Sequence, residues 1–230
     1  MIATFTVVVF LLAAFRLYII LPLSRTLKPR TASHSISTRR LAIFLGSGGH
    51  TAEALALLST LDFSRYTPRT YIISEGDILS SQKAVALEAS RAISHPKSNN
   101  DNFTILIIPR ARGVHQSILT TPPTALLSLL TCIYYVTVAP ILYSNESNSD
   151  FADLLILNGP GTCFVLCLAV YINKFAGLRT PSLIYIESFA RVKKLSLSGR
   201  LLRPLVDKFI VQWPQLLQDR GRGECHGLLV

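Results

Sequence analysis

The stretch Leu41-Ala-Ile-Phe-Leu-Gly-Ser-Gly-Gly-His-Thr-Ala-Glu53 decides the fold class of this chain. It begins with an apolar run of the length of a buried parallel strand, and the glycines after that run form a turn. Apolar residues then recur at helical spacing over residues 51–61. A strand, a glycine turn and a helix in this order predict an α/β fold built on a parallel sheet.

The same alternation continues to residue 214. Short apolar runs predict further strands at residues 70–74, 103–108, 154–157, 182–186 and 208–212. Helical patterns lie between them at residues 80–93, 117–143, 163–175 and 199–206. Strands separated by helices imply right-handed βαβ units, so we expect residues 41–214 to form one Rossmann-like, doubly wound parallel sheet.

Length and composition restrict the class of protein. The 230 residues suffice for one domain plus an appendage. Half of the residues are hydrophobic and 16% are charged, which excludes a disordered chain and argues against a purely soluble protein. A net charge of +10 together with a mean hydropathy of +0.41 favours a membrane surface over nucleic acid as the partner.

Residues 1–23 are expected to form a transmembrane anchor. The run is apolar apart from Arg16 and a few Thr and Tyr residues, and as a helix it is long enough to cross about 30 Å of hydrocarbon. No Lys or Arg precedes it, whereas residues 24–40 form a basic tether, so the positive-inside rule places the bulk of the chain in the cytosol. The alternative, a cleaved signal peptide, has a basic start and a shorter apolar core.

A cytosolic location predicts the state of several other residues. The glycosylation acceptor patterns at Asn102 and Asn145 are expected to stay unmodified, and the cysteines are expected to be reduced thiols. Cys163 and Cys167 lie one helical turn apart in an apolar stretch, which favours packing residues over a metal or redox pair. We therefore expect no metal site.

The apolar stretch at residues 125–142 has two interpretations. As a second membrane span it would separate the last three predicted strands from the first three, and one sheet would not form. We therefore favour a helix that packs on the sheet or lies half-sunk in the cytosolic leaflet. Pro122, Pro123 and Pro140 fit a helix with broken ends.

Ligands of open parallel sheets bind beyond the carboxyl ends of the strands, where the first glycine loop lies. The loop suits a phosphate or diphosphate, with Gly46, Ser47, Gly48, Gly49 and Thr51 as candidate binding residues. It lacks the Gly-Lys-Ser/Thr ending of a P-loop, and Thr51 stands where a dinucleotide fingerprint has its third glycine. Dinucleotide binding stays open, because Glu75 mimics the ribose-binding acid, and so does a glycine turn without a ligand.

Further candidate side chains follow at the same edge of the sheet. Histidine titrates in the range that suits a general base, so His50 is a candidate base or ligand-orienting residue. Glu75 and Glu187 are candidates for contacts with sugar hydroxyls, for helix caps or for proton transfer. Arg191 belongs to a basic cluster with Lys193 and Lys194, which is either a solvated face or a contact for lipid headgroups or a diphosphate.

Three motifs in the chain closely resemble one family. They are Leu45-Gly-Ser-Gly-Gly-His-Thr-Ala-Glu53, Ile186-Glu-Ser-Phe-Ala-Arg-Val-Lys-Lys-Leu-Ser-Leu-Ser-Gly199 and Asp207-Lys-Phe-Ile-Val-Gln-Trp-Pro214. The family is the membrane-anchoring subunit of the two-component UDP-N-acetylglucosamine transferase of asparagine-linked glycosylation. The resemblance covers residues 41–214 and the N-terminal anchor, and its second and third motifs are long and specific.

This resemblance implies a fold, an activity and partners. It implies the N-terminal, acceptor-side half of a GT-B glycosyltransferase, in a complex that adds the second GlcNAc to GlcNAc-diphosphate-dolichol. A separate soluble subunit is expected to bind UDP-GlcNAc and to be catalytic, so this chain needs no cofactor of its own and is not expected to be active alone. The expected location is the endoplasmic reticulum membrane, single-pass and facing the cytosol, with the outer nuclear membrane as a second site.

The resemblance also suggests roles for the candidate residues. The first glycine loop is expected to bind the acceptor diphosphate, with His50 as base or acceptor-orienting residue and with Glu75, Glu187 and Arg191 as polar contacts. Residues 215–230 form a tail for docking the partner, and its apolar end is Leu228, Leu229 and Val230. Two alternatives remain, a stand-alone nucleotide-cofactor enzyme such as a small reductase and a pure scaffold. The sequence leaves open which subunit supplies the base and what the stoichiometry is.

Overall fold

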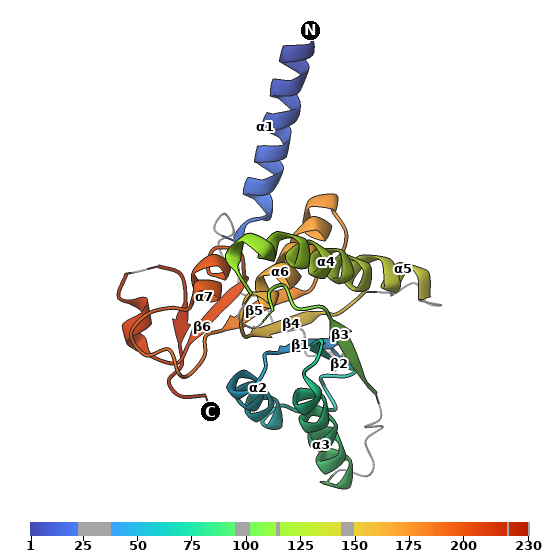
Figure 1. Ribbon diagram of the computed structural model, residues 1–230, viewed down its shortest axis with the longest axis vertical. Coiled ribbons are helices and arrows are strands. Elements are labelled where there is room, and N and C mark those ends of the chain that lie inside the picture. The colour runs from blue at the N-terminus through green and yellow to red at the C-terminus, as the bar shows by residue number, and fades with distance from the viewer. Residues whose placement is uncertain (23–37, 95–101, 114–115, 144–149, 220, 230) are drawn as a thin grey trace.

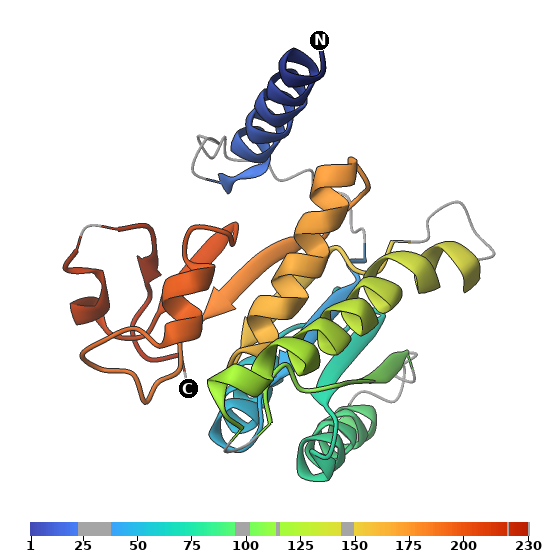
Figure 2. The same cartoon turned by 45° about the horizontal axis from the view of Figure 1, so that its top comes forward.

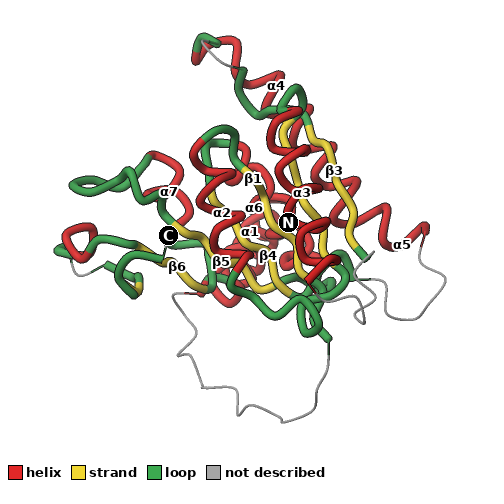
Figure 3. The backbone as a smooth tube through the Cα atoms, turned by 90° about the horizontal axis from the view of Figure 1, so that it is seen from below, coloured by secondary structure: helices red, strands yellow, loops and turns green. Residues whose placement is uncertain are grey.

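The computed structural model describes residues 1–22, 38–94, 102–113, 116–143, 150–219 and 221–229. Within these residues, the central element is one parallel sheet in the order β3-β2-β1-β4-β5-β6-β7 (Figure 1). Its strands are β1 (Leu41–Leu45), β2 (Arg69–Ser74), β3 (Phe103–Ile108), β4 (Leu154–Asn158), β5 (Ser182–Ile186), β6 (Lys208–Val211) and β7 (Glu224–Cys225). Figure 3 shows the sheet from below, running from β3 to β6.

The α/β fold and the six predicted strands are confirmed. The chain winds from β1 through β2 to β3 on one side, and then returns to place β4 on the other side of β1. Such a switch point opens a crevice between the loops that follow β1 and β4. The seventh strand, β7, was not predicted, because two residues are too short to carry an alternating pattern.

Helices cover both faces of the sheet (Figure 1). The α-helices are α1 (Ile2–Ile20), α2 (Gly49–Ser59), α3 (Ile78–Ser94), α4 (Thr121–Ile133), α5 (Ala139–Tyr143), α6 (Thr162–Ala176) and α7 (Leu197–Leu202). On one face, Ala42 and Phe44 of β1 share a core with α4 and α6. On the other face, Leu41, Ile43 and Leu45 share a core with α2 and α3. This burial on both faces explains why β1 is apolar throughout.

The predicted helix at residues 117–143 is present and packs on the protein body. By length and composition, Thr121–Leu142 is the one helix among the described residues that qualifies as a candidate membrane span. However, β1 pairs with both β2 and β4, so strands before and after this helix lie in the same sheet. A crossing between β3 and β4 is therefore excluded. The helix contacts α6 and β3 instead, and Figure 2 shows it running beside α6.

A π-helical turn, Tyr134–Val138, joins α4 to α5. Pro140 has no N–H, so the carbonyl of Val136 loses the donor that an α-helix would supply. Asn173 of α6 replaces it by donating from Nδ2 to Val136 O at 3.4 Å. The Oδ1 atom of Asn173 accepts from the Thr137 hydroxyl at 2.6 Å, so this buried amide ties the irregular turn to α6.

The N-terminal helix α1 stands away from the sheet (Figure 1). It has 19 residues and is therefore about 28 Å long, and most of its described side chains are exposed. Arg16 attaches it to the C-terminus of α6, donating from Nε to Phe175 O at 3.2 Å and from Nη2 to Lys174 O at 3.1 Å. A cation at this end of a helix satisfies carbonyls that have no partner within the helix. Most of the predicted tether lies outside the described residues.

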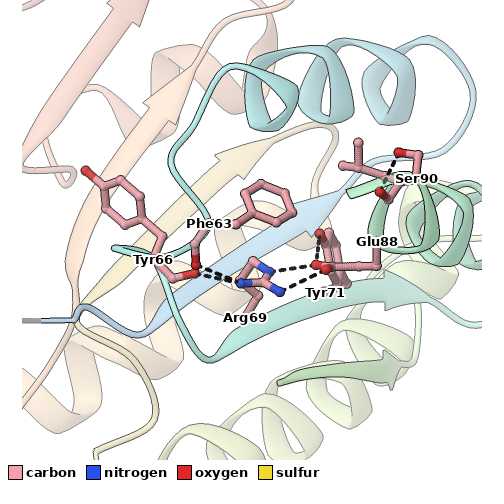
Figure 4. A network of polar contacts seen from close by, with 7 residues as sticks. Phe63, Tyr66, Arg69, Tyr71, Glu88 and Ser90 are labelled. Atoms are coloured by element: carbon pink, nitrogen blue, oxygen red, sulfur yellow. Dashed lines mark hydrogen bonds and ion pairs between the residues drawn. The ribbon is translucent and has the colours of Figure 1, made fainter. Parts of the chain in front are cut away.

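A buried ion pair fastens α3 to the sheet (Figure 4). Arg69, at the start of β2, donates from Nε and Nη2 to the two carboxylate oxygens of Glu88 at 2.6 and 2.8 Å. Its Nη1 donates to the carbonyls of Phe63 and Tyr66, and the hydroxyl of Tyr71 donates to Glu88 at 2.6 Å. Both charged side chains are 2% exposed, so water cannot replace either member of the pair as the counter-charge of the other.

Candidate functional site

A cavity of about 900 Å³ opens at the carboxyl edge of the sheet. Its walls come from the loops after β1, β3, β4 and β5, and from α4, α6 and α7. This is the switch-point crevice, where the sequence predicted a ligand site. A cavity of this volume has the size of a small-molecule binding site.

Gly46 brings the first two loops into contact. Its N–H donates to the carbonyl of Asn158 at 3.2 Å. A Cβ atom at position 46 would lie 2.8 Å from the Cβ of His50 and 2.9 Å from the Asn158 carbonyl oxygen. A side chain at position 46 would therefore push the β1 loop away from the β4 loop and from His50.

Two helices begin at the cavity. Helix α2 begins at Gly49, behind Ser47, and α6 begins at Thr162. Ser47, His50 and residues 159–162 line the cavity wall. The N-terminus of each helix carries a partial positive charge, although in α6 the N–H groups of Cys163 and Phe164 already donate to the carbonyls of Pro160 and Gly161. Both helix ends therefore favour an anionic group in the cavity.

The structure separates the predicted binding residues into two groups. Ser47, His50, Glu187 and Arg191 line the cavity, whereas Gly46, Gly48, Gly49, Thr51 and Glu75 are not part of its lining. Thr51 is buried, and its hydroxyl bonds to the carbonyl of Gly46 and to the Ser80 hydroxyl. Thr51 thus holds the loop from behind. Glu75 is exposed beyond β2, and its carbonyl accepts from Arg110 at 3.1 Å.

Glu187 organises the loop between β5 and α7. Its carboxylate is buried and accepts from both the N–H and the hydroxyl of Ser196 at 3.0 Å. Ser196 in turn caps α7 by accepting from Gly199 N at 2.9 Å. The carboxylate fills the space where a Cβ of residue 199 would lie, so this position has room only for glycine. The presence of both Glu187 and Gly199 in the second motif is therefore explained by the packing of the carboxylate against the glycine.

Two cavity residues were missed in the sequence. Arg110 and Arg112 follow β3 and line the cavity together with Arg191. Arg112 donates from Nε and Nη2 to the carbonyl of Gln116 at 2.9 and 2.7 Å, which fixes the direction of its guanidinium. Their position directly after a predicted strand was the available signal, because parallel strands end at the same edge.

One wall of the cavity is apolar. Ala125 of α4, Phe164 and Val165 of α6, and Leu197 and Leu201 of α7 form this wall. Leu197 is 68% exposed and Leu201 is 44% exposed, so the wall continues to the surface. The cavity lining therefore contains both cationic and apolar side chains.

His50 belongs to a chain of hydrogen bonds beside the cavity. Its Nδ1 lies 2.8 Å from Oδ1 of Asn158. Nδ2 of Asn158 donates to Glu53 Oε2 at 3.2 Å, and the hydroxyl of Ser188 donates to Glu53 Oε1 at 2.8 Å. These residues come from α2, the end of β4 and the loop after β5, so the fold itself positions the histidine.

The cysteines show no sign of metal or redox chemistry. All four are free thiols, and the described residues contain no cluster of metal-ligating side chains. Cys163 and Cys167 belong to α6, and both side chains are buried in the core. Burial raises the pKa of the Cys167 thiol to about 12 and that of the Cys163 thiol well above its usual value. Both thiols therefore stay protonated and unreactive.

The C-terminal tail runs beside the last strands. Leu228 is 59% exposed, whereas Leu229 packs against the core on the α2 side and donates its N–H to Gln212 Oε1 at 3.2 Å. Val230 lies outside the described residues. Among the predicted docking residues, Leu228 thus presents an apolar side chain at the surface.

A family model and several related sequences indicate the same family for this chain. The sequence model described as "Oligosaccharide biosynthesis protein Alg14 like" matches residues 41–229. The UDP-N-acetylglucosamine transferase subunit ALG14 of Cryptococcus neoformans is 47% identical over 190 residues, which are 83% of this chain and 80% of that protein. The subunit of the same name from Schizosaccharomyces pombe is 44% identical over 191 residues, 83% of each chain.

More distant similarities are also found. The Rattus norvegicus subunit of that name is 38% identical over 202 residues, covering 86% of this chain and 88% of that protein. Among solved structures, the crystal structure of Arabidopsis thaliana UGT89C1 complexed with quercetin matches with a TM-score of 0.40 and 15% identity. That match covers 76% of this chain and 44% of the plant protein.

Proposed function

The chain belongs to the Alg14-like family of oligosaccharide biosynthesis proteins, and we propose that it is the membrane-anchoring, acceptor-binding subunit of a UDP-GlcNAc transferase. Its acceptor is GlcNAc-diphosphate-dolichol, to which the complex adds the second GlcNAc. A soluble subunit binds UDP-GlcNAc and completes the cleft, as the second half of a GT-B enzyme. The relatives are named as subunits, which supports a complex of more than one chain.

The observation that carries this proposal is that cationic and apolar side chains line the same cavity. A diphosphate in the cavity is favoured by the N-termini of α2 and α6 and by the guanidinium groups of Arg110, Arg112 and Arg191. The apolar wall from α4, α6 and α7 suits the first units of a lipid chain. A polyprenyl diphosphate carries both chemical features in one molecule, whereas a free nucleotide lacks the lipid.

The proposed membrane attachment is supported by exposed apolar surface on one side of the molecule. Helix α1 is mostly apolar, with Arg16 near its C-terminal end, and is proposed to be the single membrane span. Exposed aliphatic side chains continue along α4 and α5 at Leu126, Leu127, Leu130, Ile141 and Leu142. We propose that this surface rests on the cytosolic leaflet of the endoplasmic reticulum and guides the lipid toward the cavity.

The transfer assay that tests this function compares three samples. They are this chain alone, its soluble partner alone and both together, each given UDP-GlcNAc and a short-chain GlcNAc-diphosphate lipid. We expect transfer only by the mixture, because one Rossmann-like domain supplies one half of a two-domain cleft. Transfer by this chain alone, or cofactor binding by it, would favour a self-sufficient enzyme. Unchanged transfer after substitutions throughout the glycine loop would favour a pure scaffold.

The arginines after β3 give a more specific prediction. Arg110→Gln and Arg112→Gln are each expected to raise the KM for the lipid acceptor about tenfold, because each removes a charged hydrogen-bond donor of about 1.5–3 kcal/mol from the cavity. The KM for UDP-GlcNAc should change little. Lys83→Gln, at an exposed position of α3 outside the cavity lining, removes the same charge and is the matched control. Equal increases in the acceptor KM for all three variants would show that this KM depends only on the net charge of the protein.

A further inference from the structure

The hydrogen bonds around His50 fix more than the position of its ring. Glu53 accepts from two donors, the hydroxyl of Ser188 at 2.8 Å and Nδ2 of Asn158 at 3.2 Å. An ionised carboxylate only accepts hydrogen bonds, so it must face the NH₂ end of the Asn158 amide. The oxygen end of that amide then faces His50, at 2.8 Å from Nδ1.

This orientation determines where the imidazole carries its proton. The amide oxygen of Asn158 is an acceptor, so Nδ1 of His50 has to be the donor. In the neutral ring, the second nitrogen, Nε2, is then without a proton and is an acceptor. Within the described part of the chain, Nε2 has no hydrogen-bond partner, and His50 lines the cavity.

We propose that Glu53 and Asn158 are positioning residues that hold His50 in the Nδ1–H tautomer and thereby present Nε2 to the hydroxyl of the sugar acceptor. This inference rests on the proposed transferase function for its substrate, but the tautomer itself does not depend on any substrate. Because Asn158 is an amide, it selects the tautomer without placing a carboxylate directly against the ring.

Two packing features support a dedicated arrangement. Asn158 is fully buried, so no water replaces its partners, and its amide makes a bond at both ends. Gly46 has no side chain and therefore leaves room for His50. A Cβ atom at position 46 would lie 2.8 Å from the Cβ of His50. A larger residue at position 46 would separate His50 from Asn158. The glycine loop therefore leaves room for His50, in addition to its proposed role in binding an anion.

The proposed transfer uses this nitrogen in one step. The acceptor hydroxyl oxygen forms a bond to the anomeric carbon of UDP-GlcNAc, and the bond from that carbon to the diphosphate breaks, with its electron pair leaving on UDP. The hydroxyl proton passes to Nε2 of His50 and is later released to solvent. With the other tautomer, Nε2 would carry a proton and repel the hydroxyl proton, so no transfer to this nitrogen would occur.

The tautomer is measured directly by nitrogen NMR. Full-length chain with ¹⁵N-labelled histidine, in detergent micelles, gives two-bond ¹H–¹⁵N patterns that distinguish the two neutral forms, and His50→Gln identifies the signal. We expect the Nδ1–H form in the unchanged protein. We expect a mixture, or the Nε2–H form, in Glu53→Ala and Asn158→Leu, because the amide is then free to turn or is absent. Asn158→Asp keeps an acceptor opposite Nδ1 and should retain the Nδ1–H form.

Activity measurements then distinguish a positioning role of Glu53 and Asn158 from a role in folding. In the complex with the soluble partner, Glu53→Ala and Asn158→Leu should lower kcat about 10²-fold with little change in the acceptor KM, and Asn158→Asp should restore most of the rate. Asp62→Ala, which removes an exposed carboxylate after α2 and outside the cavity lining, is the matched control and should change neither readout. An Nε2–H ring in the unchanged protein, or the same tautomer in all variants, would overturn the proposal whatever the activity. If His50 is found in the Nδ1–H form but no sample transfers GlcNAc, the proposed function would be overturned instead.

Discussion

His50→Ala is expected to lower kcat for GlcNAc transfer by the two-subunit complex about 10²–10⁴-fold, the usual contribution of a positioned base. The residue lines the cavity, is bonded to Asn158 and lies at the start of α2, where the acceptor diphosphate is proposed to bind. The acceptor KM should rise much less, since the arginines and helix ends remain. Initial rates at varied acceptor concentration measure both quantities.

The control for this prediction is a histidine far from the cavity. His226 is exposed in the tail, outside the cavity lining, and bonds to Glu224 at 3.0 Å. With the partner subunit at a saturating concentration, so that any change in docking has no effect, His226→Ala should leave the rate unchanged. A normal rate in His50→Ala would show that this histidine neither accepts the proton nor orients the acceptor. The base would then have to come from the partner subunit.

Glu88→Leu is expected to destabilise the protein by about 3–5 kcal/mol, the cost of leaving one member of a buried ion pair alone. The substitution leaves the guanidinium of Arg69 buried without its two carboxylate bonds, and it removes the acceptor of the Tyr71 hydroxyl. Burial, with help from Glu88, raises the pKa of Tyr71, so its hydroxyl stays a neutral donor that needs this acceptor. For a chain of this size, the thermal midpoint should fall by about 6–20 °C.

A double substitution separates the loss of the pair from the loss of packing. Arg69→Met combined with Glu88→Leu replaces both charges by apolar side chains of similar volume. Such replacements are often neutral or stabilising, so the double variant should recover most of the lost stability. Thermal unfolding of the full chain in detergent, followed by circular dichroism, measures all three proteins. A double variant as unstable as Glu88→Leu would contradict this account.

Most of the sheet could be predicted because its strands are buried on both faces. β1, for example, has no exposed residue, so its apolar run appears directly in the sequence. Arg69 shows the limit of this signal, since a charged residue at a strand start is ordinarily assigned to the surface, and its partner Glu88 lies 19 residues away. The π-helical turn was also unpredictable, because it depends on Asn173 reaching across from α6.

The candidate site could be located from the sequence but not resolved into roles. The rule that ligands bind at the carboxyl ends of parallel strands pointed to the edge of the sheet where the cavity lies, and His50 was singled out there. Its partner Asn158 is 108 positions away and meets it only because β1 pairs with β4. Thr51 was expected at the ligand; in the structure its hydroxyl bonds to Gly46 and to Ser80, and the second contact requires the folded position of α3.

Helix α6 connects the two regions on which the proposed function depends. Its first residue, Thr162, lines the cavity, and its last turn receives Arg16 from the proposed anchor. With 15 residues, the helix is about 22 Å long. One continuous helix therefore keeps the proposed anchor and the proposed diphosphate site at a fixed separation, so the lipid-linked sugar and its membrane attachment meet the same rigid element.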